Sequence, residues 1–566
     1  EDLIQAATTG GEGITGNANL NILNGLVIGS DGGDIRFNPQ QQYNWKSDLD
    51  LWGGDGINGN TGLGNLKNII VTAGNAGKVY LSKSTIGYHT IDAWGGNAFN
   101  GSFSGIIQNG NFYAGSGMSD IAFTAGNTTI NAQGGSAIIN SGTGTISNGL
   151  FQGGDGGKNI YLTITGSTDN EINLSSGNAL SGGFNIEDGV FKGGNGGSIY
   201  INRTSDETVT TIIDAVGGHA IEVNQNSIIN GGVFQGGNAG TVVHNGRNNT
   251  DGIPNAILDI NVKGGHGILH TAGNITINDG TFIGGSGGKA RFNSQTNANF
   301  VESNLGLGAF FSGGSVVING GQFTGGNNGT LIENSLIELP GTAIIASNST
   351  SFSLNGGIVN GHLDIKDTPV VSLNGGTIAK NIYLSDNIDL NVDNDLSLHG
   401  SFIHDGGTIT TTIDEPSDGS VFKRLSIDNG TFTFSGNEFI SATNAMVSLK
   451  QNGSLDLQAG GTLALGTDLN VGYGSLTSQN NLELDKYSTL RLGFNGVDKG
   501  SINISGNLNL DADGANVQII GTVITNTGSV SFGSIDNITD INKIKADFGW
   551  LVKENVIHNT NTTLSF

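Results

Sequence analysis

Carboxylate and carboxamide side chains recur at one position of a short repeated motif, and this is the arrangement in the chain best suited to chemistry. The motif reads apolar, Asp or Asn, apolar, any residue, and in most copies Gly-Gly; its second position is held by Asp50, Asp92, Asn131, Asn173, Asp214 and Asn261. Side chains alternate between the two faces of a strand, so this position faces outward while its apolar neighbours face inward. A column of outward carboxylates could bind a cation or perform acid–base catalysis.

Two considerations favour a solvated face over a metal or catalytic site. If each forty-residue unit makes two coils of about twenty residues, equivalent positions recur on every second coil, roughly 9.6 Å apart. Half of the positions also carry amides instead of carboxylates. We therefore predict no catalytic residue, no metal ligand and no cofactor here, with cation binding or polysaccharide-cleaving chemistry as the alternative.

Two further motifs invite a metal interpretation. The corner Gly-Gly-Asp155-Gly-Gly is similar to calcium-binding nonapeptide repeats, but it lacks their tandem nine-residue period. His219 and His266 hold the same slot one unit apart, and neither has a Cys, His or Glu at ligand spacing. The chain also shows no Ser-His-Asp, P-loop or zinc signature. The sequence therefore predicts a protein that is not an enzyme.

Two tryptophans stand out on the outward side of the same motif. Trp52 and Trp94 occupy a slot that other copies fill with Gln133, Ser175, Val216 and Lys263. Two exposed indoles on one face require a cover or a partner. We predict a surface-contact site at Trp52 and Trp94, either packed under an inserted loop at residues 37–45 or against a neighbouring molecule, or serving as a platform on which carbohydrate stacks.

A second repeat sets the elements that position these side chains. A block that reads Asn, Asp or Gly, then Gly-x-Phe-x-Gly-Gly, returns every 39 to 48 residues, and its aromatic position is held by Phe112, Phe151, Phe191, Phe234, Phe282 and Phe323. Both neighbours of each Phe vary in polarity while the centre does not, so the ring faces inward. Repetition at such an interval is typical of a solenoid.

Glycine decides between a helical solenoid and a β-solenoid. The chain has 97 glycines in 566 residues, and each interior Gly would cost a helix roughly 1 kcal/mol relative to Ala. Gly-Gly, Asn-Gly and Asp-Gly pairs instead supply the positive φ values of tight corners between short strands. The sequence predicts an all-β fold, a β-solenoid of about twenty residues per coil.

The repeats change character along the chain and predict three segments. Residues 1–339 form a regular solenoid of forty-residue double repeats. Residues 340–534 continue it with plainer coils, such as two Leu-Asn-Gly-Gly motifs nineteen residues apart. Residues 535–566 form a C-terminal cap or docking segment, in which Ile541, Ile544 and Phe548 stand at helical spacing.

Composition limits the partners. The formal net charge is −25, with 48 acidic and 23 basic residues and no basic stripe, which argues against nucleic acid. No apolar run approaches the roughly eighteen residues that span a bilayer, so we predict no transmembrane segment. Cysteine is absent, which fits an oxidising exterior, and because the chain begins at Glu1 without an apolar leader we expect a processed form.

These Gly-, Asn-, Thr- and Ser-rich, cysteine-free, acidic coils resemble the β-helical passengers of bacterial autotransporters and of filamentous-haemagglutinin-like exoproteins over essentially the whole chain. An amino-terminal secretion module and a carboxy-terminal translocator barrel are not recognisable. The resemblance implies a right-handed parallel β-helix, secreted or on the bacterial cell surface. It implies adhesion, aggregation or fibre formation, with the protein itself or cell-surface glycans and proteins as partners; a polysaccharide-binding or polysaccharide-degrading β-helix is the alternative.

The first residues form a candidate assembly edge. The first coil block begins within about ten residues of Glu1, which leaves little chain for a folded cap over an open β-helix end. The alternating segment that contains Leu3 and Ile4 could add as a strand to a neighbour. We predict end-to-end assembly or docking through this edge, the alternatives being a natural cap that was removed and a minimal cap made by residues 1–9.

Overall fold

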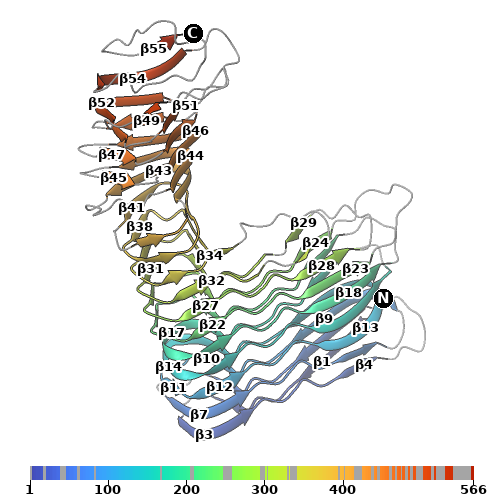
Figure 1. The fold of residues 1–566 in the computed structure, drawn as a ribbon. Coiled ribbons are helices and arrows are strands. Elements are labelled where there is room, and N and C mark those ends of the chain that lie inside the picture. The colour runs from blue at the N-terminus through green and yellow to red at the C-terminus, as the bar shows by residue number, and fades with distance from the viewer. Residues whose placement is uncertain are drawn as a thin grey trace, which may run out of the picture. The chain divides into compact units, whose positions relative to one another are not determined.

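The computed structural model describes residues 3–412 with short gaps, and beyond them separate strands between residues 424 and 565. The gaps in the first part are 17–20, 38–45, 60–63, 82–84, 166–168, 204–209, 246–257, 293–299, 303, 328–329, 332–340, 393–395 and 401. Every regular element of the described residues is a β-strand, and the strands are labelled β1 to β55 (Figure 1). Among these residues we find no helix with the length and apolarity of a membrane span.

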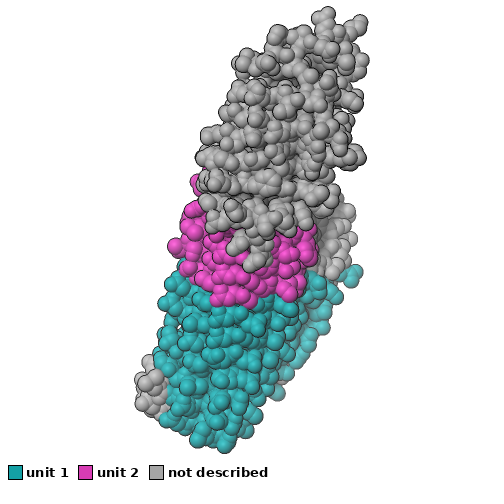
Figure 2. Space-filling view, turned by 60° about the vertical axis from the view of Figure 1, so that its left-hand side comes forward, with its two compact units in different colours: residues 1–314, 321–345 teal, residues 315–320, 346–566 magenta. Residues whose placement is uncertain are grey.

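The chain divides into two units, which are described separately (Figure 2). Unit 1 comprises residues 1–314 and 321–345, and unit 2 comprises residues 315–320 and 346–566. Within each unit, strands of successive coils pair in parallel, as Phe191 does with Phe234 in unit 1 and Val371 with Leu390 in unit 2. The prediction of an all-β, parallel β-solenoid is confirmed.

Each complete coil of unit 1 contains five strand positions. In one coil these are β20 (Ile221–Val223), β21 (Ser227–Ile229), β22 (Val233–Gln235), β23 (Thr241–Asn245) and β24 (Leu258–Asn261). They pair in the same order with β25 (Ile268–His270), β26 (Ile275–Ile277), β27 (Thr281–Ile283), β28 (Lys289–Phe292) and β29 (Phe300–Glu302). One pass through all five positions is therefore one coil.

This register corrects the predicted coil length in unit 1. Phe112 pairs with Phe151 and Phe151 with Phe191, so a residue meets its equivalent 39 or 40 positions later. The two twenty-residue halves of a repeat are thus two sides of one coil and not two stacked coils. Unit 2 does have short coils, because Phe352 pairs with Val371, 19 residues further on.

The two halves of each unit 1 coil meet along a line of backbone hydrogen bonds, which we call the glycine seam. Gly74 N donates to Gly54 O, Gly96 N to Gly74 O and Gly115 N to Gly96 O, each at 2.9 Å. Gly54 and Gly96 follow strands β5 (Lys46–Trp52) and β9 (Thr85–Trp94), whereas Gly74 and Gly115 follow β7 (Asn65–Thr72) and β12 (Gly110–Tyr113). The bonds therefore alternate between the outgoing and the returning pass of the chain. The seam continues in this way to Gly326.

Only glycine fits at the seam because the two passes touch through their backbones. A Cβ atom on Gly53 would lie 2.0 Å from Gly74 O, and one on Gly193 would lie 1.9 Å from Gly218 O. No real Cβ contact is so short, and backbone atoms cannot turn away as a flexible side chain can. The Gly-Gly pairs are therefore required by this close approach, and they divide the coil into two lobes.

The first lobe, here the Phe lobe, is built on positions such as β20, β21 and β22. The predicted inward rings are fully buried and stack in one column, with centroids 5.3 Å apart for Phe112 and Phe151 and 4.7 Å apart for Phe191 and Phe234. Burial of each ring stabilises the lobe by about 1.5–3 kcal/mol, and stacking adds to this. The inward assignment of the Phe slot is confirmed.

The second lobe, here the thin lobe, is built on positions such as β23 and β24. Its strands belong to one thirteen-stranded sheet that runs from β29 to β33 (Thr330–Leu331), together with the separate pair of β4 (Ile35–Phe37) and β8 (Val79–Leu81). They lie to the right in Figure 1. Ile130, Ile172 and Ile213 from one side and Ile160 and Ile199 from the other share one buried cluster. The thin lobe carries the motif with the outward Asp or Asn column.

Unit 2 builds its coils from three short strands. Strands β35 (Ser351–Leu354), β36 (Ile358–Val359) and β37 (His362–Lys366) pair with β38 (Val370–Leu373), β39 (Gly376–Ile378) and β40 (Ile382–Leu384). Near the C-terminus, β54 (Ser529–Ile538) pairs antiparallel with β55 (Thr563–Ser565). The predicted helical segment with Ile541, Ile544 and Phe548 lies outside the described residues.

Candidate functional site

Two neighbouring strands of the thin lobe, β5 (Lys46–Trp52) and β9 (Thr85–Trp94), position the candidate site. Their parallel register places Asp50 beside Asp92 and Trp52 beside Trp94. The apolar residues that alternate with them along the two strands, such as Leu49 and Ile91, are buried. Because successive side chains point to opposite faces of a strand, the carboxylates and the indoles lie on the outward face. The prediction that these two side-chain types share one face follows directly from the pattern, and the structure confirms it.

The outward column predicted from the motif is also real. The register continues from Asp92 in β9 to Asn131 in β13 (Ser119–Gln133), and then through Asn173, Asp214 and Asn261. These residues lie on adjacent strands, about 4.8 Å apart. The expected spacing of 9.6 Å was wrong because it assumed twenty-residue coils. Wide spacing is therefore no longer a reason against a metal or catalytic site in this column, and only the amides remain as a reason.

Trp52 and Trp94 form a stacked pair on this face. Their ring centroids are 6.1 Å apart, the planes are inclined by 23°, and the two residues are 50% and 41% exposed. Thr9 of β1 (Leu3–Thr9) is beside Trp52 on one side, and Gln133 of β13 is beside Trp94 on the other. Of residues 37–45, one of the predicted covers, all but Phe37 lie outside the described residues.

The carboxylates beside the indoles come from three positions. Asp48, Asp50 and Asp92 each place one oxygen within 4.8 Å of the other two, and all three side chains are half-buried. Asn131 Nδ2 donates to Asp92 Oδ1 at 2.6 Å. Partial burial raises the pKa of Asp50 above its ordinary value, and the negative charges of Asp48 and Asp92 raise this pKa further. The site therefore concentrates negative charge next to an aromatic surface.

No ion pair neutralises these three carboxylates among the side chains that the structure describes. The two described ion pairs join Lys78 to Asp120 and Lys158 to Asp155. The convergent oxygens could share a divalent cation, as carboxylates do in calcium sites. The sequence-based prediction of no metal therefore stays a prediction. Asp48 was not singled out from the sequence, although its place two residues before Asp50 puts it on the same face.

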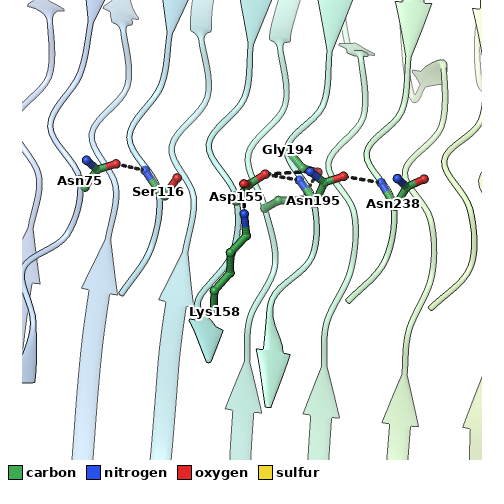
Figure 3. A network of polar contacts seen from close by, with 8 residues as sticks. Asn75, Ser116, Asp155, Lys158, Gly194, Asn195 and Asn238 are labelled. Atoms are coloured by element: carbon green, nitrogen blue, oxygen red, sulfur yellow. Dashed lines mark hydrogen bonds and ion pairs between the residues drawn. The ribbon is translucent and has the colours of Figure 1, made fainter. Parts of the chain in front are cut away.

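The corner at Asp155 has a structural role. Asn195 donates to Asp155 Oδ1 from its backbone nitrogen at 2.7 Å and from Nδ2 at 3.1 Å, and Lys158 pairs with the other carboxylate oxygen (Figure 3). Asn238 N in turn donates to Asn195 Oδ1 at 3.1 Å. The same contact occurs on earlier coils, where Asp31 accepts from Asn75 N and Asn75 from Ser116 N. The acidic corner thus belongs to a set of side chains that accept a backbone N–H from the next coil.

His219 and His266 belong to a second set of this kind. His266 N donates to His219 Nδ1 and Leu307 N to His266 Nδ1, both at 2.9 Å, and the two rings stack with centroids 5.0 Å apart. Burial lowers the pKa of His219 to about 4. One coil earlier the same acceptor role falls to Asn178, which receives the N–H of His219 at 2.8 Å. The shared slot noted in the sequence was the signal for this role.

The predicted assembly edge forms a strand. Residues Leu3–Thr9 make β1, which pairs in parallel with β5, so that Leu3 is opposite Lys46 and Ile4 opposite Ser47. A strand in this position has one hydrogen-bonding edge engaged by β5. Whether Leu3 and Ile4 mediate contact with another molecule stays a prediction.

Comparison of the chain with known protein families, with curated proteins and with solved structures finds no match. The resemblance to autotransporter passengers and haemagglutinin-like exoproteins therefore stays a prediction. Function has to be argued from the geometry of the two lobes and of the outward face on β5 and β9.

Proposed function

We propose that this chain is a structural and adhesive β-solenoid, exported to the bacterial surface or the extracellular space, that makes its contacts through the outward face of β5 and β9. The observation that carries the proposal is the glycine seam. It links the outgoing and returning passes of successive coils by backbone hydrogen bonds from Gly54 to Gly326. A chain that devotes so much sequence to stacking serves as a scaffold for the surface it presents.

The adhesive half of the proposal rests on the stacked indoles. Trp52 and Trp94 are large apolar side chains held about half exposed on a rigid sheet. Aromatic residues of this kind dominate the energy of protein contact surfaces, because they bury much area at little cost in conformational entropy. A pair fixed in register on β5 and β9 is preorganised for such a contact.

The extracellular location is supported by composition. The chain has no cysteine and a formal net charge of −25. Such a chain suits passage through an envelope and solubility in an oxidising exterior. Fibre formation would use the strand at Leu3–Thr9, which could take a further strand by augmentation.

A polysaccharide-binding protein is the second candidate, favoured by the same Trp52 and Trp94 pair. Sugars stack their apolar faces on indoles, and carboxylates such as Asp50 accept hydrogen bonds from hydroxyl groups. Against this, the two rings stack on each other, so that each keeps at most one face for a ligand.

Adhesion of coated beads to cultured cells tests the proposal. Beads carrying the chain should bind cell monolayers well above albumin-coated beads, and Trp52→Ser/Trp94→Ser should abolish most of this binding. Tyr161→Ser/Tyr200→Ser is the matched control, because Tyr161 and Tyr200 are also exposed and stacked, with centroids 4.9 Å apart, on other strands of the thin lobe. Binding no greater than that of albumin, or equal loss in both variants, would contradict the proposal.

A further inference from the structure

We infer that the outward face of β5 and β9 docks arginine side chains of a partner polypeptide, with the guanidinium group bridging Asp50 and Asp92 and lying against the indole of Trp52. The inference names the partner chemistry of the contact surface proposed above and rests on that proposal. It is drawn from the charge, the register and the exposure of four side chains.

Charge complementarity indicates that the partner group is positively charged. Asp48, Asp50 and Asp92 bring their oxygens together without an ion pair from any described side chain. The mutual repulsion contributes to the raised pKa of Asp50. The whole chain carries a formal charge of −25, which attracts cations to the surface before they dock. A cationic group would relieve this repulsion, whereas a neutral sugar would leave it in place.

The neighbouring indoles favour an organic cation over a bare metal ion. Trp52 lies two residues beyond Asp50 on the same face of β5, about 6.6 Å along the strand. An organic cation over an indole face gains a cation–π attraction. A metal ion bound by the carboxylates would make no use of the indole. The carboxylates and the indole therefore suit a flat organic cation that meets the carboxylates with its edge and the ring with its face.

Guanidinium fits the spacing better than ammonium. Asp50 and Asp92 are in register on adjacent strands, about 4.8 Å apart at the backbone, so their oxygens can accept from two different nitrogens of one planar group. A guanidinium carries five N–H donors in a fixed fork and also stacks flat on an aromatic ring. A lysine ammonium is a compact point charge without either property.

The chain contains a natural comparison for this site. Asp214 lies in the same column between Asn173 and Asn261, and it also has its pKa raised, chiefly by burial. Its neighbour two residues further on is Val216 in place of a tryptophan. Asp50 and Asp92 have both a neighbouring carboxylate in the column and a nearby indole, whereas Asp214 has neither. Asp214 is therefore the control position.

The test is fluorescence anisotropy with two labelled peptides, Gly-Arg-Gly-Arg-Gly and Gly-Lys-Gly-Lys-Gly, added to the full chain at 0.15 M salt. The arginine peptide should bind at least about fivefold more tightly than the lysine peptide. Asp50→Asn/Asp92→Asn should weaken arginine binding at least about tenfold, and Trp52→Ala about three- to tenfold. Asp214→Asn should change it less than about twofold.

Two further variants separate binding from folding and from simple charge. The substituted Asp and Trp side chains face outward, so the melting curves should match that of the parent chain. Trp52→Phe, which keeps an aromatic ring, should retain most of the affinity. Lys46→Gln, at the start of β5 on the side of Asp48 away from Trp52, should leave binding unchanged or slightly stronger. A loss of binding in Lys46→Gln would contradict the assignment.

Other outcomes overturn the inference in distinguishable ways. Equal affinity for both peptides, or equal loss in Asp214→Asn, would show attraction to general negative charge. Displacement of the peptide by micromolar calcium would assign the carboxylates to a metal, and displacement by an oligosaccharide would assign the face to glycans. Tryptophan-dependent bead adhesion without peptide binding would refute the arginine site and leave the adhesive function standing, whereas peptide binding without bead adhesion would refute the adhesive function.

Discussion

The backbone N–H of Gly74 donates a hydrogen bond of 2.9 Å to the carbonyl oxygen of Gly54. Gly54 follows β5 in the thin lobe and Gly74 follows β7 in the Phe lobe, so this bond joins two opposite passes of the chain. Repeated to Gly326, it makes one coil of unit 1 from two similar halves. This relationship sets the coil length, and the coil length places the carboxylates of the outward column on adjacent strands.

Substitution within the seam should be costly. In Gly236→Ala the new Cβ would lie 2.0 Å from Gly265 O on the opposite pass, so the two passes must separate and lose hydrogen bonds. We expect a loss of at least about 2 kcal/mol in local stability, measured by hydrogen exchange of the amides in that coil. Gly11→Ala is the control, since its Cβ would meet nothing closer than Ser30 Oγ at 3.5 Å. Equal exchange rates in both variants would contradict the seam.

The Phe column should show the cost of a cavity. Phe191 is fully buried between Phe151 and Phe234, with centroids 4.9 and 4.7 Å away. Phe191→Ala should therefore cost about 3–5 kcal/mol, whereas Lys192→Ala, at the exposed next position, should stay within about 0.5 kcal/mol of the parent chain. Limited proteolysis and thermal melting measure the difference, and equal protease resistance would refute the inward assignment.

Acid should weaken the coils that contain His219 and His266. Burial lowers the pKa of His219 in the folded chain to about 4, from an unfolded value near 6.5. The unfolded state therefore binds protons first as the pH falls, so the contribution of this group to stability is complete above pH 6.5 and is lost progressively down to pH 4. Stability measured across this range by denaturant should decline.

The variant His219→Asn/His266→Asn isolates that effect. Asparagine keeps a side-chain oxygen as acceptor for the backbone N–H, as Asn178 does for His219. The double variant should fold and should lose less stability than the parent chain between pH 6.5 and 4, because its carboxylates still titrate but its imidazoles do not. An unchanged pH profile would show that these histidines do not act as neutral acceptors.

Chelation should leave the fold intact. The carboxylate of Asp155 is already engaged by Asn195 and Lys158, which leaves the corner no need of an ion. The melting curve should be the same with and without a chelator, since no stabilisation by mass action would be lost. A lower melting temperature after chelation would show that acidic corners or the Asp48, Asp50 and Asp92 cluster hold a structural metal.

Much of the fold could be predicted because alternation and glycine content are local properties. The inward Phe slot and the outward column with Asp50 and Asp92 follow from period-two patterning, which does not depend on what a strand pairs with. Coil length does depend on pairing. Gln133-Gly134-Gly135 and Gln152-Gly153-Gly154 look like equivalent corners, yet they lie on opposite passes of one coil, and sequence similarity cannot tell stacking from crossing.

The candidate site was partly predictable for the same reason. The exposure of Trp52 and Trp94 could be predicted from the strand pattern. The short distances among the carboxylates of Asp48, Asp50 and Asp92 could be predicted only with the correct coil length. The neutral state of His219 was not predictable, because it depends on burial and on a backbone donor 47 residues away along the chain.

Two deletions test the forty-residue coil most directly. Removal of residues 152–191 takes out one full coil and joins Phe151 to Lys192 in the register that Phe191 had. Removal of residues 134–152 joins Gln133 to Gly153, which would delete one coil if coils were about twenty residues long. We predict that the first variant melts cooperatively near the parent temperature and the second does not, because the second loses one pass of the seam. A second variant as stable as the first would contradict the two-lobed coil, because both deletions would then remove whole coils.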